Sequence, residues 1–489
     1  MPLNAGGTGY GSVAAPGLSA SVTGSETASL LVSDLEPEQQ WRPMSKEDLE
    51  LSAGGPGWRR VRCYLVVLFW LAWLAMLAIA VAIIVTSPRP VPARLGWWQK
   101  SLFFQLQTGP RPVESGAIDA LREQLPYLKS LGISTLILKG LFEQSASSVN
   151  ATGSGQRSGT LPQIQHLLSE SDKAGLKVVL DVCGVQLFEP QDDVKQHVLR
   201  FWLGEGVAGF LICDTDEAYS EETLLTWRNI MEGFSQDEER IIVVKQTGDL
   251  LPPPRGSTQD QLNITLVDVV MRSVLPASPH PLSADEVATA IESHLTTPEH
   301  TWLGWQVGGK APYDLKKLLL VLIMTLPGTP ALQYEELDPT QSVSQHDGSL
   351  QGANNSESSA SDFHADKVKL RHSFAALLTS LSHIRAREEA LLFGSLTFLP
   401  FNTSSSTNST PSPILAFLRS WGCVHFLVLL NIGAEPHTLD TAWAPSLPEA
   451  GVFVSSSGVE RLGAVTLKTL VLHPREAVVV KLFEPGSYS

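Results

Sequence analysis

The chain has 489 residues, 43% of them hydrophobic, so it is long enough to hold two or three domains with buried cores. Its 35 basic and 50 acidic residues give a formal net charge of −15, which argues against a nucleic-acid partner. A scaffold built from disulfides is excluded because the chain has four cysteines in all.

The N-terminal segment, residues 1–63, is predicted to be a mostly disordered tail. Gly, Ala, Ser and Thr dominate its first 44 residues, which contain few large apolar side chains. Near its end, the stretch MSKEDLEL from Met44 predicts a short capped helix that leads into a Gly-Pro-Gly turn.

Residues 64–85 form an apolar run that contains no charge, Gly, Pro or Asn: YLVVLFWLAWLAMLAIAVAIIV. As a helix it would span about 33 Å, enough to cross the hydrocarbon core of a bilayer. A buried helix of a globular domain is the alternative, but such helices are usually shorter or keep a polar face. A cleaved signal peptide would not follow a tail of this length. We therefore predict a transmembrane helix.

Two observations predict the orientation of this helix. Three arginines, Arg59, Arg60 and Arg62, directly precede it, which favours a cytoplasmic N-terminus. All Asn-x-Ser/Thr glycosylation motifs follow it, at Asn150, Asn263, Asn354, Asn402 and Asn408. We expect a single-pass type II glycoprotein with an extracellular C-terminal part.

The extracellular part begins with a stiff neck, residues 86–98, that contains SPRPVP. In residues 99–389, apolar β-branched runs then alternate with helical stretches. The runs are SLFFQLQ, ISTLILKG, LKVVLDVC, VAGFLIC, RIIVVKQ, ITLVDVVM, TWLGWQV and TPALQYE. Eight such runs predict an α/β domain that closes as a (β/α)8 TIM barrel, with a closing helix from Lys367 to Glu389. An open doubly wound sheet is the alternative, but no Gly-rich phosphate loop follows the first run.

The last segment, residues 390–489, contains short strand-like runs separated by turns, which predict a C-terminal antiparallel β-sandwich. Two hydrophilic stretches that carry glycosylation motifs, residues 341–361 and 402–413, are predicted to be surface loops.

Several strings resemble the α-amylase family of glycoside hydrolases. YLKSLGISTLIL is similar to the approach to that family's second strand, and FWLGEGVAGF is similar to the approach to its fourth. TLPGTPALQYEEL resembles its eighth strand. Within this family, GPGWRRVRCYLVVLFWLAWLAMLAIAVAIIV and the Trp97-Trp98 pair resemble the membrane-anchored heavy subunits of heteromeric amino-acid transporters. No bulky insert follows the third strand, which favours the 4F2 type of heavy subunit.

The resemblance also locates the positions where amylases carry their catalytic groups. A retaining glycosidase needs two carboxylates about 5 Å apart. The nucleophile position falls on Cys213, and the arginine position two residues earlier falls on Leu211. The proton-donor position falls on Lys245 or Gln246. Asp214 is a poor replacement for the nucleophile unless the strand ends before it, because neighbouring side chains on a strand point to opposite faces.

The third-strand motif keeps Asp181, but its Asn-His pair has become Val185-Gln186, and the seventh strand lacks its His-Asp pair. We expect no enzyme activity, no cofactor and no metal, with Asp181 kept as a structural hydrogen-bonding carboxylate. Cys183 and Cys213 lie near the ends of adjacent strands. We expect two free, buried thiols, with a disulfide as the alternative.

Four tryptophans, Trp97, Trp98, Trp302 and Trp305, could stack on a sugar in a cleft, but packing in a core is the more frequent role of such residues.

In the heavy-subunit family, a cysteine just outside the membrane forms a disulfide with the transporter light chain. The matching neck here reads SPRPVPARLG and has none, while Cys63 lies on the cytoplasmic side. We therefore expect no interchain disulfide and a noncovalent association.

The resemblance implies a non-catalytic plasma-membrane subunit that supports the stability and trafficking of a multi-span amino-acid transporter light chain. The transmembrane alanines offer small surfaces for helix packing or simply face lipid: Ala72, Ala75, Ala78, Ala80 and Ala82. The alternatives are an adhesion or signalling glycoprotein that binds other membrane receptors, and a glucosidase with a rearranged site.

Overall fold

The computed structural model describes residues 45–53, 55–86, 92–107, 117–141, 161–185, 193–235, 238–247, 265–275, 283–295, 301–307, 315–334, 357–400, 413–439, 447–458 and 461–482. The predicted tail before Ser45 and the asparagines of all five glycosylation motifs lie outside these residues. The chain divides into two compact units, residues 1–88 and 89–489, and each is described by itself.

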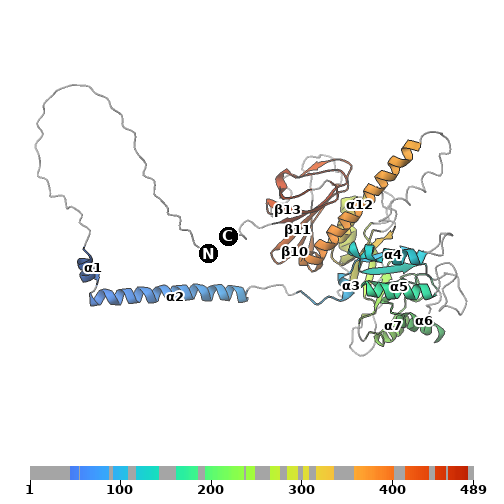
Figure 1. Ribbon diagram of the computed structural model, residues 1–489, viewed down its shortest axis with the longest axis horizontal. Helices are drawn as coiled ribbons and strands as arrows, with labels where there is room; N and C mark the ends of the chain where they lie inside the picture. The colour runs from blue at the N-terminus through green and yellow to red at the C-terminus, as the bar shows by residue number, and fades with distance from the viewer. Residues whose placement is uncertain are drawn as a thin grey trace, which may run out of the picture. The chain divides into compact units, whose positions relative to one another are not determined.

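Within residues 45–86, the described part of the first unit contains the helices α1 (Lys46–Ala53) and α2 (Pro56–Thr86). The Ser45 hydroxyl accepts a hydrogen bond from the backbone N–H of Asp48 at 3.3 Å, so α1 is capped as its sequence predicts. Pro56 is the first residue of α2. A backbone N–H at this position would have no acceptor within the helix, so the absence of an N–H in proline has no cost. Residues 57–83 of α2 have a mean hydropathy of 2.7 and no buried share, so α2 is long and apolar enough to cross a membrane (Figure 1).

The second unit begins with a closed barrel of eight parallel strands in sequence order, as the eight apolar runs predict. The strands are β1 (Phe103–Gln107), β2 (Thr135–Lys139), β3 (Lys177–Asp181), β4 (Gly209–Cys213), β5 (Ile241–Lys245), β6 (Val269–Ser273), β7 (Trp302–Gln306) and β8 (Thr329–Gln333). β1 pairs with both β2 and β8, which closes the barrel.

Amphipathic helices surround these strands and bury their apolar faces against them (Figure 1). They are α4 (Ala117–Ser130), α5 (Leu161–Lys173), α6 (Asp193–Gly204), α7 (Glu221–Glu232), α8 (Ala284–Leu295) and α9 (Lys316–Thr325). Most show one buried stripe, whereas α9 reads KKLLLVLIMT and is buried from Leu318 to Thr325. α9 contacts β8, the long helix α12 (Glu357–Arg387) and two strands of the C-terminal domain, so it has no solvent-facing stripe.

The base of the barrel, where the strands begin, is closed by the short helix α3 (Trp97–Lys100). Trp98 is 8% exposed and belongs to the core cluster inside the barrel, with Phe103, Ile137 and Val179. Its backbone carbonyl accepts a hydrogen bond from the hydroxyl of Thr329 at 3.0 Å. The chain therefore enters the barrel domain through a packed aromatic plug.

The C-terminal domain is antiparallel, as predicted, and consists of two sheets. A six-stranded sheet has the order β14-β13-β16-β11-β10-β9, and a two-stranded sheet pairs β12 with β15. The strands are β9 (Ser395–Leu399), β10 (Ile414–Trp421), β11 (Val424–Asn431), β12 (His437–Thr438), β13 (Ala450–Ser456), β14 (Ala464–Thr466), β15 (Val471–Leu472) and β16 (Ala477–Leu482).

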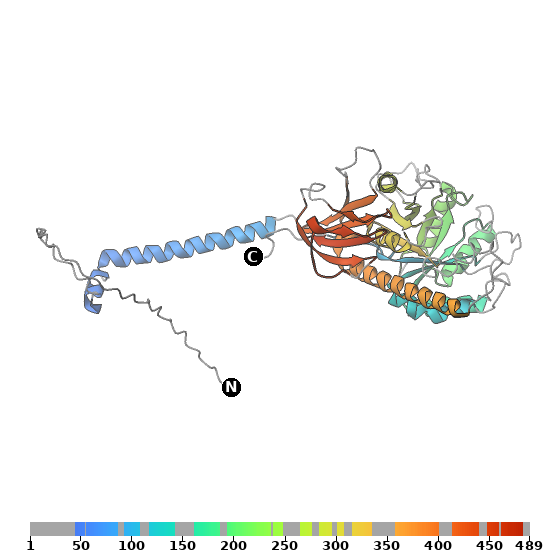
Figure 2. The same ribbon diagram turned by 90° about the horizontal axis from the view of Figure 1, so that it is seen from above.

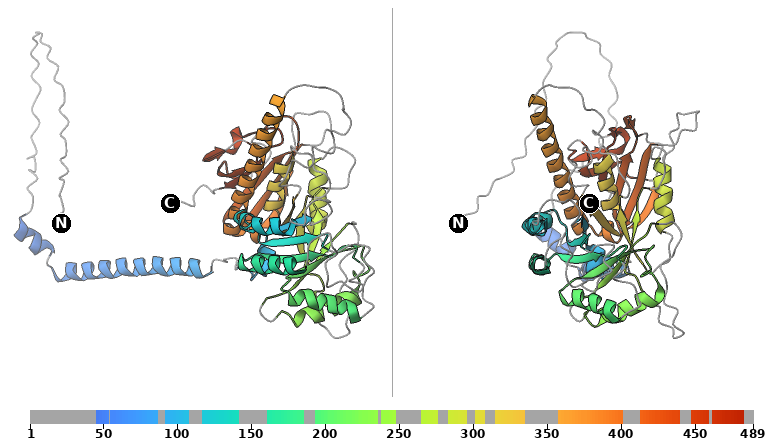
Figure 3. Two further views of the ribbon diagram at one scale, coloured as in Figure 1. Left: turned by 45° about the vertical axis from the view of Figure 1, so that its right-hand side comes forward. Right: turned by 90° about the vertical axis from the view of Figure 1, so that its right-hand side faces the viewer.

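Both faces of the six-stranded sheet are buried. Phe417, Phe426 and Val428 join the core that extends to the barrel helices, whereas Leu427 and Leu429 join a second core with Leu472 of β15. This two-sided burial explains the continuous apolar runs of β10, β11 and β16. Figure 3 shows the sheet, drawn in red and brown, beside the barrel.

The closing helix α12 is longer than predicted. It begins at Glu357, so the end of the predicted hydrophilic loop at residues 341–361 is helical. The short helix α13 (Glu389–Leu392) follows it directly. Figure 2 shows α12, in orange, beside the antiparallel sheet and along the barrel.

Two buried arginines join the barrel to the C-terminal domain without a carboxylate partner among the hydrogen bonds described for them. Arg419 of β10 donates to the carbonyls of Thr325, Leu391 and Gly394 at 2.8 to 2.9 Å. Arg385 of α12 donates to Met324 and Leu326 at 2.8 and 3.1 Å, and also to Gly328.

Several of these carbonyls belong to the C-terminal end of α9, where a helix favours cations. Burial lowers the pKa of Arg385 to about 10, and burial together with the charge of Arg385 lowers the pKa of Arg419 to about 9. Both groups remain protonated at neutral pH. We call this pair the arginine junction.

Candidate functional site

The C-terminal ends of β2 to β5 bring the predicted amylase-like positions together at one end of the barrel, the barrel mouth. Lys139 is paired in register with Asp181, and Asp181 with Leu211. Cys213, the last residue of β4, is paired with Lys245, the last residue of β5. Parallel strands carry functional side chains at these ends, so this is the position at which a TIM barrel builds its active site.

Asp181 is the one acidic side chain among these four strand ends, and it is 5% exposed. Its carboxylate accepts hydrogen bonds from the Gln105 side-chain amide at 2.9 Å and from the backbone N–H of Cys183 at 3.1 Å. Burial raises the pKa of Asp181, while these two hydrogen bonds and the charges of Lys139 and Lys245 oppose the rise. The structure places Asp181 in the hydrogen-bonding role expected from the sequence.

The other amylase-like positions hold groups of different chemistry. Leu211 is fully buried and packs inside the barrel with Val179 and Val243. Lys245 is partly buried, and burial followed by the charge of Lys139 lowers its pKa, against the opposing effect of Asp181. The barrel mouth thus presents two ammonium groups and one buried carboxylate at these strand ends.

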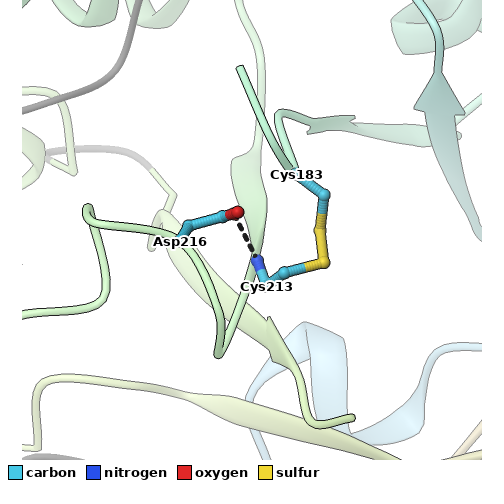
Figure 4. A group of neighbouring side chains, drawn as sticks. All are labelled: Cys183, Cys213 and Asp216. Carbon is cyan, nitrogen blue, oxygen red and sulfur yellow. Dashed lines mark hydrogen bonds between the residues drawn. A yellow bond between two sulfur atoms is a disulfide. The ribbon is translucent and has the colours of Figure 1, made fainter. Parts of the chain in front are cut away.

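The expectation of free thiols at Cys183 and Cys213 is wrong. The two cysteines form a disulfide, with their Cα atoms 5.0 Å apart (Figure 4). The physical reason is that Cys183 lies just beyond β3, while Cys213 ends the neighbouring strand β4. Adjacent parallel strands therefore bring the two Cβ atoms within bonding range. Neither cysteine is fully buried.

Asp216 is a residue at this site that the sequence argument missed. One carboxylate oxygen accepts a hydrogen bond from the backbone N–H of Cys213 at 2.8 Å (Figure 4). The other accepts from the backbone N–H of Gly184 at 2.9 Å. Asp216 therefore ties together the two segments that the disulfide links. An Asx turn would link its side chain to a backbone N–H two residues later, whereas Asp216 binds N–H groups that precede it, so the sequence carried no specific signal for this contact.

Asp214 follows the last residue of β4, so the alternation of strand side chains no longer governs it. Both of its carboxylate oxygens bind Thr247, one accepting from the backbone N–H at 2.9 Å and one from the hydroxyl at 2.6 Å. Asp214 therefore holds the segment that follows β5.

The four tryptophans pack in cores, as the more frequent role predicts. Trp98 is buried inside the barrel, Trp97 and Trp302 pack against the same cluster, and Trp305 is fully buried among the outer helices. Trp302 begins β7, so it lies with Trp98 at the base of the barrel, away from the mouth.

The raised pKa of Asp181 predicts a pH-dependent effect of the substitution Asp181→Asn. A carboxyl whose pKa is higher in the folded than in the unfolded state stabilises the fold as the pH falls through the folded pKa. Asparagine does not titrate. We compare the free energy of unfolding of the parent with that of Asp181→Asn. The parent's advantage should increase as the pH is lowered from 7 toward about 4. The increase should be about 1.4 kcal/mol for each unit by which the pKa of Asp181 is raised. Chemical denaturation over this pH range measures the difference. A difference that stays constant or decreases contradicts the assignment.

One long apolar helix, a (β/α)8 barrel and an antiparallel C-terminal domain together define the class: a protein with one candidate membrane anchor and an α-amylase-like fold. Solved structures agree on the fold. Trehalose-6-phosphate hydrolase of Bacillus licheniformis aligns with a TM-score of 0.56 and 11% identity, covering 80% of this chain and all of that one. Trehalulose synthase of Pseudomonas mesoacidophila aligns with a TM-score of 0.54 and 14% identity, with the same coverage.

Sequence comparisons give the particular relationship. Residues 32–104 match the family described as solute carrier family 3 member 2 N-terminus. The amino acid transporter heavy chains SLC3A2 of rabbit (Oryctolagus cuniculus) and rat (Rattus norvegicus) are 29% and 27% identical, covering 91% and 90% of this chain and 89% and 88% of theirs. Human amino acid transporter heavy chain SLC3A1 is 26% identical over 34% of this chain and 24% of its own length.

The chain is therefore similar to the SLC3A2 amino-acid transporter heavy chains over about nine-tenths of its length, which confirms the predicted resemblance to the 4F2 heavy chain. The similarity extends over both the apolar helix and the barrel domain.

Proposed function

We propose that this protein is a non-catalytic heavy subunit that associates with a multi-span amino-acid transporter light chain and supports its stability and delivery to the plasma membrane. The observation that carries the proposal is the similarity to amino acid transporter heavy chains over about nine-tenths of the chain. That similarity includes the anchor, so it extends beyond the barrel that glycosidases share.

The side chains at the barrel mouth support a non-catalytic role. Glycosidase chemistry needs a carboxylate nucleophile and a carboxylic acid as proton donor. The predicted resemblance to amylases puts Cys213 at the nucleophile position and Lys245 or Gln246 at the proton-donor position, and Cys213 is bonded to Cys183. A disulfide sulfur is not a nucleophile, and an ammonium group cannot replace a carboxylate that forms a glycosyl intermediate. We expect the intact protein to leave α-glucoside reporters uncleaved, and turnover that is lost in Asp181→Asn would favour the glucosidase alternative.

The anchor supports the proposed division of labour. One apolar helix without a charge in residues 64–85 offers no path for a polar amino acid, so transport belongs to the partner. The arginines before this helix favour a cytoplasmic N-terminus and an extracellular barrel domain. We propose glycosylation at one or more of Asn150, Asn263, Asn354, Asn402 and Asn408, which mass spectrometry of the membrane-derived protein would locate.

We propose that the contact with the light chain is noncovalent and involves α2, whose apolar side chains are exposed in the isolated chain. From the sequence, Cys63 and the neck were the positions relevant to an interchain disulfide. The structure adds Cys423, an exposed free thiol at the turn between β10 and β11. The noncovalent proposal therefore requires that neither Cys63 nor Cys423 forms a disulfide with the light chain.

On non-reducing gels of the native complex, we expect the heavy subunit to migrate alone. The membrane is solubilised in the presence of a thiol-blocking reagent, so that no new disulfide forms after lysis. A heterodimer band that disappears with dithiothreitol contradicts the noncovalent proposal. Cys63→Ser and Cys423→Ser, tested singly, would identify the cysteine responsible.

The trafficking role is tested by removing the chain from cells that express it. We expect the light chain at the surface, measured by biotinylation, and the uptake of its amino acids to fall together. Both should return with the full chain. Unchanged surface light chain after complete removal would contradict the proposal.

A further inference from the structure

The disulfide and Asp216 form a compact group of potential metal ligands at the barrel mouth, although the sequence predicts no metal site. Among the residues that the structure describes, the sulfur atoms of Cys183 and Cys213 and a carboxylate oxygen of Asp216 all lie within 4.8 Å of one another. We propose that reduction of this disulfide converts the group into a binding site for Zn²⁺.

The three ligands come from a rigid part of the fold. Cys213 ends β4, Cys183 follows β3, and Asp216 follows β4 in a turn closed by its own N–H, which donates to the Cys213 carbonyl at 3.1 Å. The Asp216 carboxylate is already aimed by two backbone N–H groups, those of Cys213 and Gly184. Each carboxylate oxygen keeps a second lone pair, so these hydrogen bonds fix the ligand without consuming it.

The ligand types match the chemistry of zinc. Zn²⁺ prefers tetrahedral sites made of thiolate, imidazole and carboxylate, and three protein ligands leave one position for water. The disulfide form cannot act as such a site, because its sulfur atoms carry no thiolate charge. Two thiolates and one carboxylate would leave a net charge of −1 around Zn²⁺, and Lys245, paired in register with Cys213, supplies a nearby positive charge.

The change between the two forms is a two-electron reduction. A dithiol attacks the disulfide through its thiolate, forms a mixed disulfide, and then closes on itself as its second thiol displaces the remaining protein sulfur. The dithiol is oxidised to a cyclic disulfide, and Cys183 and Cys213 are released as thiols. Zn²⁺ then replaces one proton on each thiol, so binding releases two protons.

The test uses the full chain in detergent micelles, in a Cys63→Ser/Cys423→Ser background that removes the two exposed free thiols. A phosphine reductant opens the disulfide, taking up one oxygen from water as phosphine oxide, and is then removed by gel filtration without oxygen. Co²⁺ serves as the spectroscopic probe, because its thiolate charge-transfer absorption reports bound sulfur, and Zn²⁺ is added as the competitor.

We expect one Co²⁺ for each reduced chain, with a thiolate absorption band that Zn²⁺ abolishes, and no such band in the oxidised chain. Cys183→Ser/Cys213→Ser should remove the band. Asp216→Asn should weaken the affinity for Zn²⁺ by at least ~10-fold, judged from the effect of disturbing metal ligation in other proteins. Circular dichroism and thermal unfolding establish that each sample is folded.

Several results would overturn the proposal. They are the absence of a thiolate band in the reduced folded chain, unchanged Co²⁺ binding in Cys183→Ser/Cys213→Ser, and unchanged affinity in Asp216→Asn. Unfolding of the chain on reduction would overturn it as well, since the three ligands would then no longer be held together. Asp285→Asn, on the exposed first turn of α8, is the matched control and should bind as the parent does.

Discussion

Replacing Arg419 by methionine is expected to lower the free energy of unfolding by about 3 kcal/mol, because it leaves three buried carbonyl groups without their donor. Those carbonyls belong to two segments that meet at the arginine junction: Thr325 ends α9, while Leu391 and Gly394 lie in and just after α13. Removing a buried charge recovers part of its desolvation cost, so the net loss is smaller than the sum of three orphaned groups. Denaturant unfolding of the full chain in micelles measures the effect.

Arg387 provides the matched control, since it is exposed two residues after Arg385 in the same helix. Arg387→Met should change stability by less than about 0.5 kcal/mol. Arg419→Lys keeps the charge but offers a single ammonium in place of the guanidinium fork, so it should fall between the parent and Arg419→Met. Equal stability of the parent and Arg419→Met would show that the arginine junction contributes little.

Replacing Trp98 by alanine is expected to cost about 3–5 kcal/mol, the range for truncating a large buried aromatic side chain. The indole plugs the base of the barrel and contacts the innermost core cluster. Its loss leaves a cavity that Phe103 and Ile137 cannot fill, because both are fixed on barrel strands. Thermal or denaturant unfolding followed by near-ultraviolet circular dichroism would report the change.

Trp98→Phe preserves part of the plug and should lose less than half as much stability as Trp98→Ala. Tyr127, 43% exposed on α4, offers a control at an exposed aromatic position, and Tyr127→Ala should be close to neutral. A loss for Trp98→Ala no larger than that of Tyr127→Ala would mean that the plug is not part of the folding core.

The barrel could be predicted from the sequence because its signal is repeated. Seven of the eight strands lie within one of the predicted apolar runs, and β6 (Val269–Ser273) begins within its run and ends two residues beyond it. Glycines in turns separate several of these runs. Gly328, at φ +107° between α9 and β8, shows why: a Cβ there would lie 2.5 Å from the Leu303 carbonyl oxygen. The Leu-Pro-Gly-Thr-Pro string therefore reflects a backbone requirement.

The arrangement of the C-terminal domain was less accessible to prediction. Strand-like runs indicated an antiparallel domain, but a run such as VHFLVLL does not say what covers each face. One face is covered by α9, which belongs to the barrel, together with α12 and α13, and the other face is covered by the small β12–β15 sheet. The arginine junction was missed for the same reason, since its acceptors are carbonyl groups that have no sequence signature.

At the barrel mouth, the disulfide is the feature that could not be predicted from the sequence. The sequence placed Cys183 and Cys213 near the ends of neighbouring strands, which allowed both free thiols and a bond. The choice depends on the register of β3 against β4 and on the turn that Asp216 fixes, which are features of three-dimensional geometry. The predicted departures from the amylase pattern at Leu211, Cys213 and Lys245, by contrast, depend on single positions and on no strand register.

The central claim, that this chain is the heavy subunit of a transporter, is tested most directly by purifying the tagged full-length protein from membranes in mild detergent. Quantitative mass spectrometry then measures what accompanies it. We expect one multi-span amino-acid transporter in a 1:1 ratio with the chain, retained in the presence of reducing agent and lost when α2 is replaced by an unrelated transmembrane helix. Recovery of the folded chain with no multi-span transporter near that ratio would contradict it.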